Sequence, residues 1–111
     1  MQIETTTRER LSVIHVRGSM DALSVNEFDN ECKRVLDDGA QGVVVEMSGL
    51  EYISSAGLRG ILILAKMAQA KGVKLAFAGM RDMVLDMFKL SGFMTILSVH
   101  EEESTAVSHV L

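Results

Sequence analysis

The chain has 111 residues, of which 48% are hydrophobic and 23% are charged. That length and balance are typical of one soluble globular domain, which we expect to span residues 1–111. The 15 acidic and 11 basic residues give a net charge of −4, which argues against non-specific nucleic-acid binding, because such binding needs basic groups that neutralise phosphates.

Cysteine and histidine usage argues against several other classes of protein. Cys32 is the only cysteine, so an internal disulfide and a cysteine metal cluster are both excluded, and we interpret it as a small core residue. No pair of His or Cys stands at metal-ligand spacing, and no glycine-rich nucleotide motif is present. We therefore expect no metal and no cofactor.

The chain shows no signal for a membrane or for export. Its start, MQIETTTRER, lacks the apolar core of a signal peptide, and the longest apolar run, GILILAKMAQA, is too short to cross a bilayer. We expect a cytoplasmic protein, and nothing in the sequence demands more than a monomer.

Two strands are expected at the start of the chain. Residues 2–7 (QIETTT) predict an edge strand, and residues 11–18 (LSVIHVRG) are rich in β-branched residues. Ile14 and Val16 alternate with polar residues, whereas the first half of this run has the opposite phase. Either a bulge or a strand buried on both faces would explain the change.

The first helix is expected to begin at Ser24. Ser24 and Glu27 match a capping box, and Leu23 with Phe28 would form the hydrophobic staple around it. Gly39 ends the helix. The apolar residues at helical spacing are Val25, Phe28, Cys32, Val35 and Leu36.

Strands and helices alternate through the rest of the chain. The unbroken run GVVVEM, residues 42–47, is typical of a parallel strand that is covered on both faces. The later elements expected are a helix after the serine pair that ends at Gly72, a strand over 73–79, a helix that ends at Gly92, a strand over 93–99 and a closing helix over 103–111. The pattern predicts an α/β domain with one mixed, mostly parallel sheet of four to five strands and about four helices.

The methionines are divided between the core and the surface. Met83 and Met87 fall on the inward face of the third helix and are interpreted as core residues. Met80 and Met94 are candidates for an adaptable binding surface.

The stretch EYISSAGLRG, residues 51–60, places two serines where a strand leads into a helix. A hydrolase nucleophile elbow needs glycine two residues before its serine, and Ile53 stands there instead, so we expect no catalysis. One interpretation is a helix cap, because serine accepts hydrogen bonds from the free amides of the first turn. A second is phosphorylation, since a helix N-terminus stabilises an added dianion.

Three segments resemble the STAS family, and specifically the bacterial anti-sigma factor antagonists. They are GSMDAL (18–23), LEYISSAGLRGIL (50–62) and LDMFKLSGFMTIL (85–97), and their order extends over essentially the whole chain. The central segment resembles the family's phosphorylation motif. The resemblance implies a STAS fold.

The resemblance also implies a partner switch. The unphosphorylated protein would bind an anti-sigma factor that is also a serine kinase with a histidine-kinase-like ATPase fold, and so release a sigma factor. The kinase would phosphorylate the motif serine and end the binding, and a serine phosphatase would reset the switch. The alternative within the fold is a STAS scaffold or a transport-complex subunit that does not act on a sigma factor.

The motif serine corresponds to Ser55, which we favour over Ser54 as the phosphorylation site. Ser54 stands where many members carry aspartate. Arg59, one helical turn after Ser55, would contact the phosphate or an acidic partner, or would remain a solvated residue. The resemblance places the partner-binding surface at Asp21, Ser54, Ser55, Gly57, Leu58 and Arg59.

Overall fold

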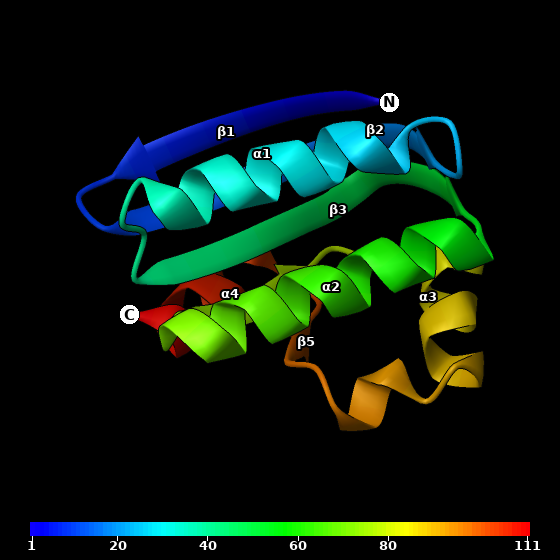
Figure 1. Cartoon of the computed structure of the whole chain (residues 1–111). Helices are drawn as coiled ribbons and strands as arrows, with labels where there is room; N and C mark the ends of the chain where they lie inside the picture. The colour runs from blue at the N-terminus through cyan, green and yellow to red at the C-terminus, as the bar shows by residue number, and fades with distance from the viewer.

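The computed structural model describes all 111 residues as one five-stranded sheet with four α-helices and one short 3-10 helix (Figure 1). The expected single-sheet α/β architecture is confirmed. In chain order the elements are β1 (Gln2–Arg8), β2 (Leu11–Met20), α1 (Val25–Asp37), β3 (Gly42–Ile53), α2 (Ser55–Lys71), β4 (Lys74–Ala78), α3 (Asp82–Leu90), η1 (Phe93–Thr95), β5 (Val99–His100) and α4 (Glu103–Val110).

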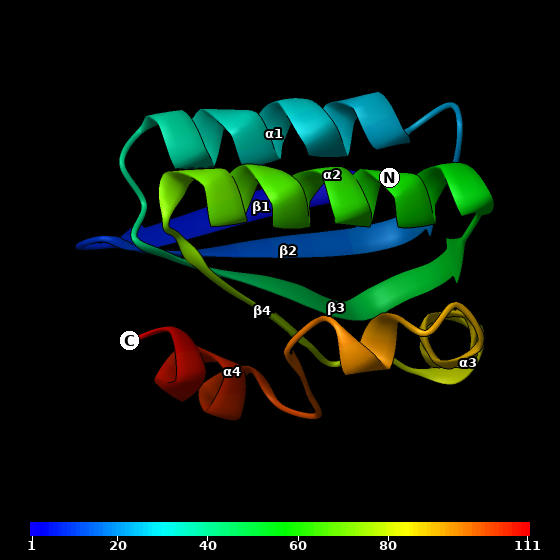
Figure 2. The same ribbon diagram turned by 60° about the horizontal axis from the view of Figure 1, so that its bottom comes forward.

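The strands lie in sequence order across the sheet. β1 is an edge strand and runs antiparallel to β2, as predicted, and each later neighbour pair is parallel. α1 and α2 lie side by side on one face, and α4 lies on the opposite side of the sheet (Figure 2). The helix α3 contacts β3.

The central strand β3 is covered on both faces, as its unbroken apolar run predicted. Val43 and Val45 belong to the larger core, which includes the buried residues of α1 and α2. Val44 points the other way, into a smaller core with Ala106 and Val110 of α4. Alternate side chains of a strand point to opposite faces, so a strand buried on both sides needs apolar residues at every position.

The phase change in β2 reflects burial on both faces, because Ile14 belongs to the larger core and Val13 belongs to the smaller core with α4. The register shifts between His15 and Arg17 and again between Gly18 and Ser19. Both shifts lie beyond the phase change, so of the two explanations offered by the sequence the strand buried on both faces is confirmed.

The prediction of Cys32 as a core residue is confirmed, because its side chain is fully buried. Burial raises the pKa of the Cys32 thiol far above its ordinary value. The thiol is therefore uncharged and shielded from reagents.

The predicted strand over residues 93–99 is wrong. Phe93 begins the 3-10 helix η1, and only Val99 and His100 form a strand. The ring of Phe93 packs edge-on against Phe88 of α3, with ring centroids 5.5 Å apart. Gly92 adopts the left-handed region, with φ of 80°, and turns the chain toward that contact. Burial of an aromatic ring therefore overrides the local strand propensity.

The interpretation of the methionines is partly wrong. Met80 is only 8% exposed and belongs to the core, so it is not a surface residue. Met94 is 37% exposed, as expected. Met83 and Met87 are half-buried and pack against the larger core.

The substitution Phe93→Ala should destabilise the domain by about 3 kcal/mol, because it leaves a cavity against the ring of Phe88. Denaturant unfolding measures the change. Met94→Ala, at the next and more exposed position, is the matched control and should change the free energy of unfolding much less. Equal effects of the two substitutions would contradict the proposed role of the Phe93 ring.

Candidate functional site

The two adjacent serines have different structural roles. Ser54 is the N-cap of α2, and its hydroxyl accepts a hydrogen bond from the N–H of Gly57 at 3.2 Å. Ser55 is the first residue of the helix, its side chain is exposed, and its hydroxyl makes no hydrogen bond. The capping interpretation is therefore confirmed for Ser54, which leaves the Ser55 hydroxyl free to meet a reagent or a partner.

The start of α2 lies directly against the end of β2. The N–H of Ser54 donates to the C=O of Met20 at 3.0 Å. A Cβ on Gly57 would lie 2.5 Å from the same carbonyl oxygen, so only glycine permits this approach. This contact fixes the position of the helix N-terminus.

The six residues expected at the partner-binding surface do not all reach the surface. Gly57 and Leu58 are buried, the latter with 8% of its area exposed. Both therefore support the start of the helix from beneath. Asp21 and Ser54 are half-buried, and Ser55 and Arg59 are exposed.

Asp21 organises the turn between β2 and α1. One oxygen of its carboxylate accepts the N–H groups of Leu23 at 3.0 Å and of Ser24 at 3.1 Å. The Ser24 hydroxyl lies 3.0 Å from the same oxygen and 2.8 Å from the C=O of Ser19. These bonds stabilise the charged carboxylate, so the pKa of Asp21 lies below its usual value, with the Ser24 hydroxyl as the largest cause.

The predicted capping box at the start of α1 is wrong. Ser24 occupies the N-cap position, but its side chain makes no capping bond because it is engaged by Asp21 and Ser19. The predicted hydrophobic staple is also wrong, since Leu23 is 95% exposed whereas Phe28 is fully buried. The bonded turn instead presents Leu23 to solvent.

Leu23 and Tyr52 are exposed apolar side chains that the sequence interpretation did not assign to the site. Tyr52 is 45% exposed and lies near the end of β3, paired with Ser19 of β2. Both residues lie in the two segments that meet at the start of α2. The sequence did contain a signal for Leu23: it is an apolar residue in a turn and belongs to no apolar face of a helix.

The electrostatic environment of Ser55 favours an added negative charge. The first turn of α2 contains no acidic residue, and the helix begins with N–H groups that have no partner inside the helix. Arg59 is exposed on the same helix and makes no ion pair. A phosphate on Ser55 would therefore meet the positive end of the helix dipole.

The family assignment rests on a match that covers nearly the whole chain. The family model described as STAS domain matches residues 2–106. The chain belongs to the STAS family. The fold in Figure 1 and the strand–serine–helix junction are therefore those of a STAS domain.

Two similar proteins are named as anti-sigma factor antagonists. BtrV of Bordetella bronchiseptica, named for the role of anti-sigma factor antagonist, is 29% identical over 93 residues, which cover 84% of this chain and 80% of BtrV. The crystal structure of an anti-sigma factor antagonist from Mycobacterium paratuberculosis superimposes with a TM-score of 0.90 at 16% identity and covers 98% of this chain and 92% of that one.

The phosphorylated form of SpoIIAA, a cell fate determinant of Bacillus, also has this fold. It superimposes with a TM-score of 0.76 at 17% identity, over 99% of this chain and 100% of that one. At such identities the likeness of both structures shows the STAS fold.

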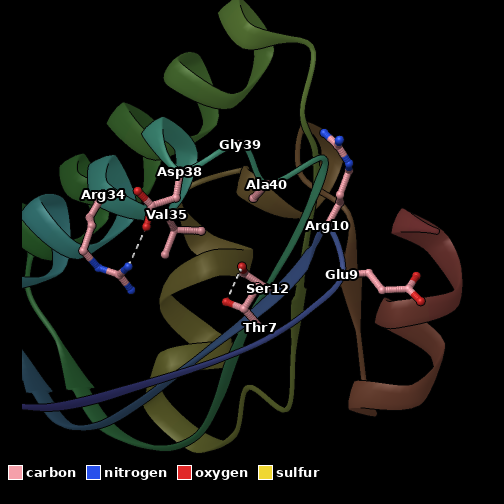
Figure 3. A pocket seen from close by; sticks show the side chains of 9 residues that line it. All are labelled: Thr7, Glu9, Arg10, Ser12, Arg34, Val35, Asp38, Gly39 and Ala40. Carbon is pink, nitrogen blue, oxygen red and sulfur yellow. Dashed lines mark hydrogen bonds and ion pairs between the residues drawn. The ribbon is translucent and has the colours of Figure 1, made fainter.

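The STAS domain has a polar cavity of about 480 Å³ at the end of the sheet remote from Ser55 (Figure 3). It is lined by the β1–β2 turn and the end of α1, where Thr7 and Ser12 bond to each other at 2.9 Å. Arg34 beside it is already paired with Asp38 at 2.9 Å. No helix of the domain is long and apolar enough to span a membrane.

No set of three or more His, Cys, Asp or Glu side chains lies close enough together to hold a metal ion. Ser55 also lines none of five surface cavities of about 380 to 540 Å³ in the domain. Its hydroxyl lies on an open surface, which suits another protein better than a small molecule.

The lowered pKa of Asp21 has a consequence for the β2–α1 turn. Its stabilising effect should be complete above the ordinary carboxyl pKa of about 4 and should be lost as the pH falls through the lower pKa of the folded state. An NMR titration of the Leu23 and Ser24 amide shifts checks this. Asp21→Asn should abolish the transition, and a transition that persists in this variant would contradict the assignment.

Proposed function

We propose that this STAS domain is an anti-sigma factor antagonist that works through a partner switch controlled at Ser55. The observation that carries the proposal is the exposed, unbonded Ser55 hydroxyl beside a serine that already caps the helix. The names of BtrV and of the mycobacterial protein support the role, and the phosphorylated form of SpoIIAA supports the chemistry.

The unphosphorylated protein binds an anti-sigma factor that is also a serine kinase of the histidine-kinase-like ATPase fold, and this binding frees the sigma factor. The surface proposed for that partner is centred on Ser55, with Arg59 and Leu23 around it. Asp21 and Ser54 hold this surface in shape, and Gly57 and Leu58 support it from within. The protein contributes no catalytic group of its own.

In the switching step the Ser55 hydroxyl oxygen bonds to the γ-phosphorus of ATP held by the kinase. The bond to ADP breaks, and the hydroxyl proton goes to a base of the kinase. The serine gains a charge of about −1.5 to −2. In a protein interface this charge costs far more to desolvate than a hydroxyl, so the complex dissociates. A serine phosphatase then restores the hydroxyl.

Ser55→Ala should keep kinase binding and accept no phosphate, whereas Ser55→Asp should weaken binding by about tenfold or more, because it places a charge in the interface. Incubation with the candidate kinase and ATP, followed by peptide mass mapping, identifies the phosphorylated residue. Titration calorimetry measures the affinity of each variant.

Ser54→Ala is the matched control for these variants. It should lose about 1 kcal/mol of stability through the missing helix cap and still be phosphorylated on Ser55. A phosphate on Ser54 would move the site, and tight binding by Ser55→Asp would refute the switch at Ser55. A stable complex with transport proteins and no phosphate would support the scaffold alternative instead.

Leu23→Ala should weaken kinase binding by about 2 kcal/mol, which is the cost of losing a leucine side chain that becomes buried in the interface. The melting temperature should not change, because the side chain is 95% exposed in the free protein. Leu111→Ala, at the 77% exposed chain end, is the matched control and should bind normally. Unchanged affinity of Leu23→Ala would remove Leu23 from the surface.

A further inference from the structure

The first half of β4 is an open edge of the sheet. β5 pairs with β4 only at Phe77 and Ala78, where the N–H of Phe77 donates to the C=O of Ser98 at 2.8 Å. Backbone groups of alternate residues in a strand point to the same side. Leu75 therefore directs its N–H and C=O to this same edge, where neither group has a hydrogen-bond partner.

An apolar groove lies beside these unpaired groups. It has a volume of about 460 Å³ and lies between the second half of α2, the start of β4 and the chain that leads into β5. Ile96 at the groove is 65% exposed, which is unusual for so large an apolar side chain. The apolar residues that line it include Leu62, Ala65, Val73, Leu75, Ile96 and Leu97.

Lysine side chains flank the edge, and no carboxylate lines the groove. Lys66 is the only charged residue in the lining. Lys74 is exposed and precedes Leu75 in the strand, so its side chain points to the opposite face of the sheet. Neither lysine makes an ion pair, whereas Lys71 nearby is paired with Asp37 at 3.1 Å. If a second copy of the chain paired at this edge, its lysines would face these lysines and repel them. The unpaired lysines therefore favour a partner segment that carries carboxylates.

We propose that this edge binds an extended segment of a partner protein in which aliphatic and acidic residues alternate. The segment adds a strand to β4, and its backbone pairs with the N–H and C=O of Leu75. Its aliphatic side chains share the face of Leu75 and enter the groove, and its carboxylates lie on the other face beside Lys74. The site uses the second half of α2 and is separate from Ser55.

NMR titration of the full chain with the peptide acetyl-Val-Asp-Val-Asp-Val-amide tests the proposal. The Leu75 amide signal should shift, and its hydrogen exchange should slow as the N–H becomes bonded. The same peptide with alternate backbone nitrogens methylated, or with Lys in place of Asp, should not bind. Ser55→Asp should bind the peptide normally, so this test is independent of the switch at Ser55.

Lys74→Glu should weaken peptide binding by about fivefold, because it replaces an attractive cross-strand pair with a repulsive one. Lys33→Glu, an exposed position on α1, is the matched control and should bind as the parent does. An unshifted Leu75 signal at millimolar peptide, or equal binding of the methylated peptide, would overturn the proposal. A concentration-dependent dimer that protects the Leu75 amide without peptide would also overturn it and identify a second copy as the occupant.

Discussion

The contact between the first turn of α2 and the end of β2 is the constraint on which the Ser55 surface depends. The C=O of Met20 accepts the N–H of Ser54, and the absence of a side chain at Gly57 lets the helix approach the same oxygen. Asp21 follows Met20 directly, so the turn that presents Leu23 and the helix that presents Ser55 share one anchor. Two segments more than 30 positions apart in the sequence, already neighbours in the β2–β3 ladder, therefore meet at one backbone carbonyl.

This anchoring determines what a phosphate on Ser55 would change. The cap bond belongs to Ser54, so modification of the Ser55 hydroxyl breaks no hydrogen bond within the domain. The added charge meets the free N–H groups of the first helical turn, which stabilise it. The fold is therefore expected to persist, and the change in free energy falls on the interface with the partner. A switch of this kind needs a rigid surface and no conformational change within the STAS domain.

The elements that could be predicted from the sequence are those whose pattern arises from local geometry. The alternation of Ile14 and Val16 in β2, the unbroken apolar run of β3 and the helical spacing around Cys32 identified buried residues correctly, because these patterns follow from the backbone geometry of strands and helices. The capping box failed because the carboxylate of Asp21 competes for the Ser24 hydroxyl, a contact that sequence spacing does not reveal. The separate roles of Ser54 and Ser55 likewise depend on which residue has extended backbone angles, and the structure gives these to Ser54.

The sheet has an open edge because residues 93–98 do not form the strand that the sequence predicted. Strand propensities differ by about 1 kcal/mol per residue, whereas loss of a buried phenylalanine costs about 3 kcal/mol or more, so the contact of Phe93 with Phe88 decides the path of the chain. The same path leaves the backbone of Leu75 without a partner and Ile96 in solvent. Exposed edges usually carry a charge that discourages unspecific pairing, and Lys74 supplies one here. The positive charge of Lys74 also discriminates among the extended segments that could pair with β4. It repels a basic segment and attracts an acidic one.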